Sequence, residues 1–481
     1  MDQLLSQLND RQYAAVTAPE ESVLILAGAG SGKTRVLTTR IAWLLQQGLA
    51  RPQQILAVTF TNKAAKEMMH RLETLLPYDL HGMWVGTFHG LCNRILRAHA
   101  ADAGLSKTFQ ILDASDQLSL VKRLMKEANL DPEQHDPRSY CAMINWNKEN
   151  GVRASSPLLA EEKKEFLALY HSYEAACQRE SVVDFAELLL RCYELLDRNE
   201  IVRSHYQARF RHILVDEFQD TNVLQYRWLM LLAGVHMGEN GRSRNAVFAV
   251  GDDDQSIYAF RGARVGNMHD FLKDFVVREP IRLEQNYRST GTILEAANAL
   301  ISNNASRLGK NLWTSGAKGE KIELQVFEDD LSEAKFVQNE IRRLMHKGLR
   351  YRDFAVLYRT NAQSRTVEQQ CSAAGLPYRV WGGQRFFERA EVKHVLAYLR
   401  LLDNPHDDTS FLRVVNFPAR GIGAKSLEQL SELARERGAS LWAALTSGLA
   451  DVPARVRVFS DLIESLRIRT DGASLSEFSL D

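Results

Sequence analysis

The stretch that most constrains the fold is AGAGSGKT, at residues 27–34. Its glycines can adopt backbone dihedrals that are closed to other residues, so several backbone N–H groups can turn toward one anion. The apolar run SVLILA (22–27) precedes it, and TRVLTTRIAWLL (34–45) follows with a helical period. A strand, a glycine loop and a helix in this order aim a helix N-terminus at phosphate. The pattern predicts a phosphate loop in which Lys33 reaches the terminal phosphates and the Thr34 hydroxyl binds Mg²⁺.

This loop departs from the usual pattern at one position, because Ala27 stands where glycine normally begins the motif. The alternative to a phosphate site is a glycine-rich turn before an ordinary helix.

Short apolar runs alternate with helical patterns along much of the chain. These runs are ILAVTF (55–60), HILVDE (212–217), AVFAVGD (246–252), IELQVF (322–327) and DFAVLYR (353–359). Continuous apolar strands between helices predict an α/β fold with parallel sheets covered on both faces. Because the last two runs lie after residue 280, we expect two α/β units. Helical patterns alone, between about 90 and 205 and again after 385, predict helical insertions.

A second strong pattern is HILVDEFQD (212–220), an apolar strand that ends in two acids. Ligands of parallel α/β sheets bind at the carboxyl edge, where these acids would lie. Asp216 is suited to hold magnesium through a water, and Glu217 to polarise an attacking water. Adjacent strand residues point to opposite faces, so we expect both acids at the very end of the strand. The alternative is a solvated acidic turn.

Composition places few limits on function. Among 481 residues, Lys+Arg and Asp+Glu both number 60, and a neutral chain can still carry a local basic groove. The five cysteines lie far apart without a CxxC pair, which predicts reduced thiols. No apolar run approaches the roughly 20 residues that span a bilayer, and the N-terminus lacks a secretory signal pattern. We therefore expect a cytoplasmic protein that does not bind membranes.

Six motifs occur in order and together carry a family resemblance. They are AGAGSGKT, AVTFTNKAAKEM (57–68), VGTFHG (85–90), VDEFQDTN (215–222), VGDDDQSIYAFRGA (250–263) and LEQNYRST (283–290). The set resembles superfamily 1 DNA helicases of the UvrD/Rep/PcrA group, from LNDRQ (8–12) to the end of the chain. The resemblance implies an α/β P-loop NTPase with two RecA-like parallel-sheet domains, each carrying a helical insertion, and ATP bound between them.

The resemblance also implies domain boundaries. The first RecA-like domain (1A) would comprise 1–89 and 208–280, and its helical insertion (1B) 90–207. The second RecA-like domain (2A) would begin at 281–382, followed by an incomplete helical domain (2B) at 383–481.

Nucleotide-binding roles follow from the same resemblance. Gln12 is similar to the glutamine that reads adenine, and Tyr287 to the aromatic residue stacked on it. Gln255 resembles the residue that senses the γ-phosphate, and Arg288 an arginine finger, for which a surface salt bridge is the alternative. Arg35 would lie near the nucleotide. The phosphate loop itself would comprise Ala27, Gly28, Ala29, Gly30, Ser31, Gly32, Lys33 and Thr34.

Candidate DNA-binding residues lie in three motifs, since single strands are held by aromatic stacking and phosphate contacts. They are Phe60, Asn62, Lys63, Phe88, His89, Tyr258, Phe260 and Arg261. We expect Phe88, Tyr258 and Phe260 to be stacking platforms, with core packing as the alternative for each ring. The stretch PARGIGAKSLEQL (418–430) resembles a hairpin that touches duplex backbone, with an ordinary turn as the alternative.

The resemblance implies an ATP- and Mg²⁺-dependent 3′–5′ DNA helicase of repair or replication. Its expected partners are single-stranded DNA, junctions of single and double strands, and repair proteins or further copies of itself. We find no stretch like the family's later GLEF-type and VTRA-type motifs, so we expect a chain truncated at the C-terminus with an incomplete second RecA-like domain. The alternative function is an ATP- and DNA-binding module with little turnover.

Overall fold

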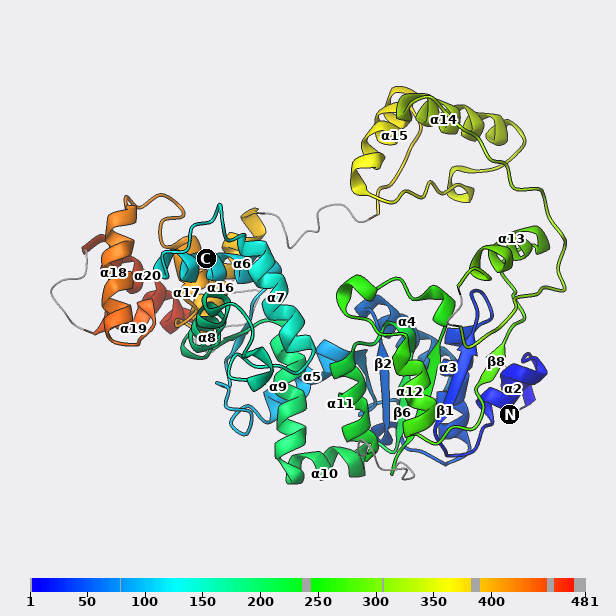
Figure 1. Cartoon of the computed structure of the whole chain (residues 1–481), viewed down its shortest axis with the longest axis horizontal. Coiled ribbons are helices and arrows are strands. Elements are labelled where there is room, and N and C mark those ends of the chain that lie inside the picture. Colours follow the sequence, from blue (N-terminus) through cyan, green and yellow to red (C-terminus); the bar gives the residue numbers. More distant parts are fainter. Residues whose placement is uncertain are drawn as a thin grey trace. The chain divides into compact units, whose positions relative to one another are not determined.

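The computed structural model describes residues 2–77, 79–235, 244–304, 307–381, 390–447 and 454–470. Its contacts divide the chain into two compact units. The first unit comprises Met1–Lys318 together with His394–Asp481, and the second comprises Gly319–Lys393. The predicted phosphate loop, the two acids and the aromatic candidates all belong to the first unit (Figure 1).

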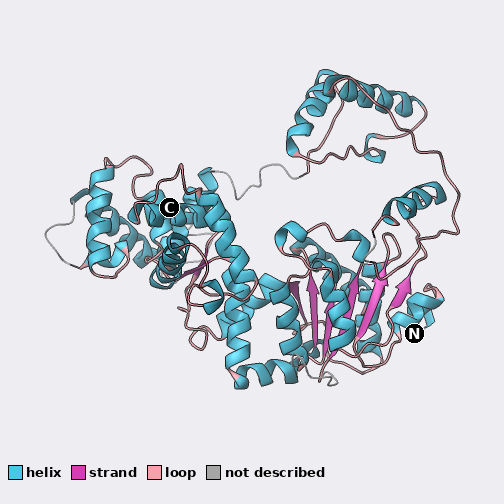
Figure 2. Cartoon of the chain, in the orientation of Figure 1, coloured by secondary structure: helices cyan, strands magenta, loops and turns pink. Residues whose placement is uncertain are grey.

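A six-stranded parallel sheet forms the centre of the first unit, with strand order β3-β2-β6-β7-β1-β8 (Figure 2). The strands are β1 (Val23–Ala27), β2 (Ile55–Thr59), β3 (Trp84–Thr87), β6 (His212–Val215), β7 (Ala246–Gly251) and β8 (Ile281–Leu283). The predicted α/β fold is confirmed. Four of the six apolar runs named from the sequence contain strands as expected, namely 22–27, 55–60, 212–217 and 246–252. Because every pairing is parallel, the carboxyl ends of these strands meet at one edge.

Helices cover both faces of this sheet, which explains why its strands are apolar without alternation. Along β1, Leu24 and Leu26 pack into the same core cluster as α11 (Val223–Ala233) and α12 (Gly266–Asp274). Their neighbours Ile25 and Ala27 pack instead with the helices α3 and α4 (Figure 1). These two helices have the bounds α3 (Lys33–Gln46) and α4 (Asn62–Leu75). All residues of β1 are buried.

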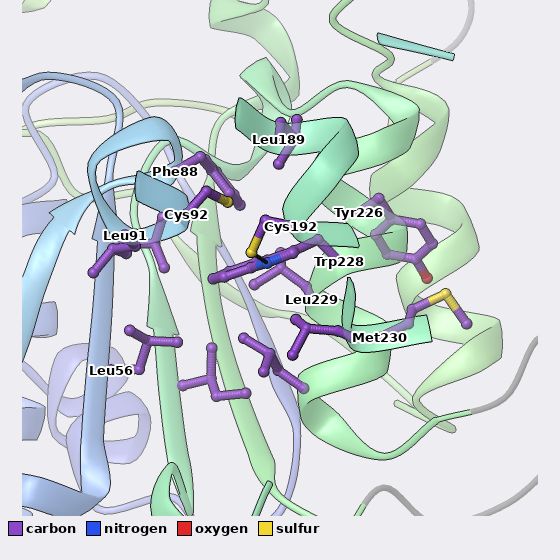
Figure 3. Packing of buried hydrophobic residues seen from close by; sticks show 14 of the residues in the cluster. Leu56, Phe88, Leu91, Cys92, Leu189, Cys192, Tyr226, Trp228, Leu229 and Met230 are labelled. Atoms are coloured by element: carbon purple, nitrogen blue, oxygen red, sulfur yellow. Dashed lines mark hydrogen bonds between the residues drawn. The ribbon is translucent and has the colours of Figure 1, made fainter. Parts of the chain in front are cut away.

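The region after the third strand is helical, as predicted. Its elements are α5 (Phe88–Ala98), β4 (Gln110–Ile111), α6 (Ala114–Glu127), α7 (Pro137–Glu149), α8 (Lys164–Arg179), β5 (Val182–Val183), α9 (Phe185–Arg198) and α10 (Glu200–Arg209). Figure 3 shows how α5, α9 and α11 share one core with the sheet. At its centre, the Trp228 indole N–H donates to Cys192 Sγ at 3.3 Å. This insertion is therefore joined to the sheet by continuous packing.

The C-terminal helices of the first unit form a core of their own. They are α16 (Ala390–Asp403), α17 (Asp408–Val414), α18 (Ala424–Glu436), α19 (Leu441–Thr446) and α20 (Ala454–Thr470). Phe411 lies edge-on to both Trp442 and Phe459 in this core. Ion pairs connect the group to α6, since Arg400 and Arg413 donate to the two carboxylate oxygens of Asp116 at 2.7 and 2.8 Å.

The second unit holds a pair of packed helices, α14 (Asp330–His346) and α15 (Asn361–Ala373). The runs 322–327 and 353–359, which we expected to be strands, are assigned no strand, and Leu324 and Leu357 are 88% and 93% exposed. A strand needs a neighbour for its backbone hydrogen bonds, and the described residues of this unit offer none. They therefore form no second sheet.

The start of the predicted second RecA-like domain also differs from expectation. β8 (Ile281–Leu283) pairs with β1 and so extends the first sheet. The helix that follows is α13 (Gly291–Ile301). Among the described helices, none combines the length and the apolar character needed to cross a lipid bilayer.

Candidate active site

The phosphate loop joins β1 to α3 through two glycines with left-handed backbone dihedrals, Gly30 (φ 65°) and Gly32 (φ 88°). A side chain is strained at both positions. The neighbours also leave no space, because a Cβ on Gly28 would lie 2.1 Å from a methyl carbon of Leu312. Ala27 is the buried last residue of β1, so its methyl group packs in the core where the usual pattern has glycine. The local geometry agrees with a phosphate-binding loop.

The two acids after β6 reach one cavity because the chain turns sharply between them. The strand ends at Val215, and Glu217 adopts a left-handed conformation (φ 50°, ψ 47°) before a short 3₁₀ turn. Such a conformation is costly for a residue with a side chain and occurs mostly at functional sites. Side chains of adjacent strand residues point to opposite faces, and the turn at Glu217 lets both acids reach the same cavity, as we expected from the sequence. Glu217 Oε2 accepts a hydrogen bond from Lys33 Nζ at 2.8 Å.

Asp216 is buried directly behind this ion pair. Its burial and the neighbouring Glu217 carboxylate raise the pKa of Asp216 to about 6. Raised pKa values of this kind are found at sites that bind cations or move protons. A divalent cation would favour the ionised form of Asp216, and Thr34 lines the same cavity. These hard oxygen donors fit Mg²⁺.

A single cavity of about 330 Å³ connects the predicted nucleotide chemistry with the predicted DNA contacts. Its lining comprises Thr34, Phe60, Thr61, Ala64, Asp216, Glu217, Gln219, Asp220, Gln255, Ile257 and Tyr258. Two of the aromatic candidates thus line the same cavity as the residues with predicted nucleotide roles. Those roles are the Mg²⁺ ligands, the water-activating acid and the γ-phosphate sensor. Sequence motifs that lie up to 224 positions apart, from 34 to 258, meet in this space.

The residues predicted to bind the base are tied together beside the loop. Gln12 is buried, and its Nε2 donates to the Ser31 carbonyl at 2.8 Å. Its Oε1 accepts from the backbone N–H of Asn9, which caps α2 (Asp10–Val16). The side-chain Nδ2 of Asn9 in turn donates to the Tyr287 hydroxyl at 2.7 Å. Gln12 and the half-exposed Tyr287 ring therefore belong to one hydrogen-bonded group, although their roles toward adenine stay predictions.

The LEQNYRST motif lies against the phosphate loop. The backbone N–H of Tyr287 donates to the Gly30 carbonyl at 2.9 Å, and Asn286 Nδ2 donates to the Ala29 carbonyl at 2.6 Å. Arg288 follows directly, and a Cβ on Gly30 would lie 2.8 Å from the Arg288 Cβ. Arg35 is exposed on α3 and donates to the side chain of Gln7. The Cβ of Arg288 thus lies beside the loop, and its role as an arginine finger stays a prediction.

Three aromatic rings, Phe60, Tyr258 and Phe260, form a row of successive contacts, and the first two line the cavity. The Phe60 and Tyr258 centroids lie 4.8 Å apart, and those of Tyr258 and Phe260 lie 6.0 Å apart. Phe260 is 75% exposed, so its ring is accessible for stacking. Asn62 is exposed at the start of α4, beside Phe60 in sequence. The side chain of Arg261 lies outside the described residues.

Phe88 does not belong to this row. It is only 5% exposed and packs edge-on against Trp228, with a centroid distance of 5.8 Å (Figure 3). The expected stacking platform is therefore a core residue in this structure, because it begins α5 on the side that faces the shared core. His89 lies edge-on to Phe185, and burial lowers the pKa of its imidazole. For both residues, a contact with DNA stays a prediction.

The predicted duplex-contacting segment 418–430 contains the start of α18. Gly421 has a left-handed backbone (φ 68°), and its carbonyl accepts from Arg455 Nη1 at 2.8 Å. A contact of this segment with DNA stays a prediction.

The sequence motifs contain two further functional candidates that we did not single out. Gln219 Nε2 donates to Glu217 Oε2, and Gln219 Oε1 accepts from the backbone N–H of Asp252, both at 2.9 Å. Asn286 holds the Ala29 carbonyl and also accepts from the backbone of Arg288. Both amides lie inside quoted motifs, VDEFQDTN and LEQNYRST, so their position there was the available signal.

Comparison with known proteins agrees with the family resemblance of the sequence motifs. The family model of the UvrD/REP helicase N-terminal domain matches residues 8–276, and that of the UvrD-like helicase C-terminal domain matches residues 281–466. The chain is 50% identical to DNA helicase II of Escherichia coli over 97% of its length and 48% identical to that of Haemophilus influenzae over 98%. It is 42% identical to the ATP-dependent DNA helicase PcrA of Bacillus subtilis over 99%. It spans 65% of the length of each of these relatives. The chain belongs to the UvrD/REP helicase family.

Proposed function

We propose that this chain binds Mg²⁺-ATP and single-stranded DNA, and couples ATP hydrolysis to 3′–5′ movement along the strand and separation of duplexes. The observation that carries the proposal is the shared cavity, in which Asp216 and Glu217 face the same space as Phe60 and Tyr258. The exposed ring of Phe260 lies next to Tyr258, and a protein that only hydrolysed ATP would have no need of it there. The names of the relatives, DNA helicase II and ATP-dependent DNA helicase PcrA, agree with the proposal.

The described ion pair suggests how the site is switched on. Lys33 now neutralises Glu217 at 2.8 Å. Triphosphate entering the loop would compete for the lysine, because its charge is larger and the loop N–H groups favour anions. Glu217, still held by the Gln219 amide, would then be free to accept a proton from water. Mg²⁺ held by Thr34 and Asp216 would neutralise charge that develops on the phosphates.

Movement on DNA would follow from the position of Gln255. Its side chain lines the cavity, and Tyr258 and Phe260 follow it within five positions. A shift of Gln255 toward or away from a γ-phosphate would therefore move the aromatic row. Because stacking is tolerant of base identity, such a row can step along any sequence. The substrates we propose are single strands and junctions between single and double strands, in repair or replication.

The alternative is a module that binds ATP and DNA with little turnover. The chain spans 65% of the length of its relatives, so their full activity is not shown for this chain. This alternative predicts nucleotide and DNA binding without strand separation.

Strand displacement on tailed duplexes tests the proposal. A labelled duplex with a 3′ single-stranded tail should be separated with ATP, and the same duplex with a 5′ tail should not. Glu217→Gln removes the proposed base and keeps the shape of the side chain, so it should bind both substrates and separate neither. Equal separation of the two duplexes would contradict the polarity. Tight ATP and DNA binding with no separation of either duplex would favour the binding module.

A further inference from the structure

Lys310 is a buried lysine whose ammonium group is surrounded by three carboxylates. Its Nζ lies 2.6 Å from Asp252 Oδ1, 2.5 Å from Asp253 Oδ1 and 2.7 Å from Asp254 Oδ2. The lysine side chain is 1% exposed. Three acids so close together have the spacing of a metal site. In this structure the ammonium group occupies the position that a metal cation would take, so the three acids bind Lys310 instead.

The acids belong to the GDDDQ motif, whereas Lys310 comes from the segment after α13. Arg307, from the same segment, forms two hydrogen bonds of 2.7 Å to the two oxygens of Asp254. The backbone N–H of Leu308 donates to Asp253 Oδ2 at 2.8 Å. We call Arg307 and Lys310 the basic clasp. Together they satisfy the acids almost completely, which is the condition under which buried charges are tolerated.

Asp252 connects the basic clasp to the proposed catalytic residues. One of its oxygens contacts Lys310, and the other accepts from Gln255 Nε2 at 2.5 Å. Its backbone N–H donates to Gln219, whose amide donates in turn to Glu217. An unbroken series of hydrogen bonds therefore runs from Lys310 to both Gln255 and Glu217.

The segment that carries the basic clasp also contacts the phosphate loop. Leu312 covers Gly28 so closely that a Cβ there would clash. The backbone of Trp313 pairs with Glu284 and Asn286, at 3.1 and 2.7 Å. The residues from Arg307 to Trp313 thus join the GDDDQ motif to the loop and to LEQNYRST. They form a physical connection between the three motifs that would contact the nucleotide.

We propose that Lys310 is a positioning residue that holds Asp252, and through it Gln255, in the geometry that couples the nucleotide to the DNA-binding rings. This role rests on the proposed function of the same cavity. Without the ammonium group, three adjacent carboxylates would repel one another in a buried site. Asp252 would then turn or take up a proton, and Gln255 would lose its fixed acceptor. A displaced sensor would still allow ATP to bind, because Lys33 and Thr34 are untouched.

The test is a double-mutant cycle between Lys310→Met and Gln255→Ala, measured on the whole chain. Two quantities are recorded: kcat and KM for ATP with saturating oligo(dT), and the change in oligo(dT) affinity caused by a non-hydrolysable ATP analogue. We expect Lys310→Met to lower kcat by about 10-fold to 100-fold, as a misplaced catalytic group does, with little change in KM. It should also abolish the change in affinity. Lys318→Ala is the matched control, since this lysine follows the same segment and its side chain forms an exposed pair of 3.7 Å with Glu295.

The cycle separates positioning from a purely structural role. If Lys310 acts through Gln255, Lys310→Met should have no further effect on kcat once Gln255 is alanine. Losses that multiply in the double variant, or full kcat in a folded Lys310→Met protein, would overturn the inference. Should Lys310→Met fail to fold, Lys310→Arg is the second variant. It keeps the positive charge, but its planar guanidinium group cannot contact all three carboxylates from one point as the ammonium group does. It should lose kcat in the same non-additive way, and full activity of Lys310→Arg would overturn the inference.

The binding readout keeps this inference distinct from the proposed function. A wild-type chain without turnover, whose oligo(dT) affinity still responds to the analogue, would contradict the helicase alone. In that case a Lys310→Met protein that keeps the response would overturn the inference, and one that loses it would support it. A wild-type chain that shows DNA-stimulated turnover, with Lys310→Met equally active, would contradict only the role of Lys310. A wild-type chain showing neither effect would overturn both.

Discussion

For Lys33 we expect a side chain that matters for ATP hydrolysis and little for folding. Within the part of the chain that the structure describes, its ammonium group pairs with Glu217 Oε2 at 2.8 Å. We expect Lys33→Ala to lower ATP turnover by about 10³-fold or more, because the charge that meets the phosphates is lost. The unfolding temperature should change little. Lys164→Ala, an exposed lysine at the start of α8, is the control. Turnover within a few fold of wild type in Lys33→Ala would refute the site.

Phe260 and Phe88 form a contrasting pair of rings, one exposed and one in the core. Phe260→Ala should weaken oligo(dT) binding by about 1–3 kcal/mol, the contribution of one stacked base, without changing stability. Phe88→Ala should instead lower the free energy of unfolding by about 3–5 kcal/mol through the cavity it leaves. Fluorescence anisotropy and chemical denaturation measure the two effects. The reverse pattern, in which Phe88→Ala affects only DNA binding, would contradict the structure.

Single residues also mark the limit of what the sequence could reveal. Lys33, Thr34, Asp216 and Glu217 were predictable because a local motif fixes their place at the end of a strand. Lys310 was not, since it lies 57 positions from Asp253 and belongs to no quoted motif. For Phe88 the sequence left both stacking and core packing open, because exposure depends on packing with α9 and α11, which are far away in sequence.

At the scale of elements, α7 ends with an acid in an unfavourable place. Burial and the nearby Asp184 raise the pKa of Glu149 to about 7, and the C-terminal end of a helix also disfavours a negative charge. A carboxyl whose pKa is higher in the folded state stabilises the protein at low pH. That contribution is lost as the pH rises from about 4.5 to 7.

Glu149→Gln should therefore stabilise the chain at pH 8 and not at pH 4. The gain in unfolding free energy at pH 8 should be at most about 3 kcal/mol, from the size of the pKa shift. Chemical denaturation across this pH range measures it. Glu165→Gln, at an exposed acid in the first turn of α8, is the control and should show no such trend. A gain that is the same at every pH would contradict the assignment.

Elements with a local signature were predictable, and those that need a partner were not. The run before AGAGSGKT forms β1, and the run after it forms α3. In both, the apolar pattern of the segment matches the side that is buried in the fold. The run 322–327 has an equally apolar strand pattern, yet its described residues form no strand. β-structure depends on neighbours that a single segment does not contain. The same reason explains why β8 joined the first sheet.

At the scale of the whole first unit, Asp116 links the helical insertion to the C-terminal helices. It is 3% exposed and accepts from both Arg400 and Arg413. Asp116→Ala leaves two arginines without their shared partner, so we expect the helices from α16 to α20 to become sensitive to proteolysis before the sheet does. Lys126→Ala should have little effect, since its pair with Glu428 at the same contact is exposed. Unchanged cleavage in Asp116→Ala would contradict this role, and would show that the remaining contacts, such as Asn404 with the Glu180 carbonyl at 3.1 Å, suffice.

The central claim is that one cavity serves both the nucleotide and the single strand. It is tested most directly by steady-state ATP hydrolysis of this chain with and without oligo(dT). The account predicts a low basal rate that DNA raises several-fold or more, and a Phe260→Ala variant that needs a higher DNA concentration for the same stimulation. An ATP hydrolysis rate that is identical with and without DNA, in a chain that binds both ligands, would contradict it.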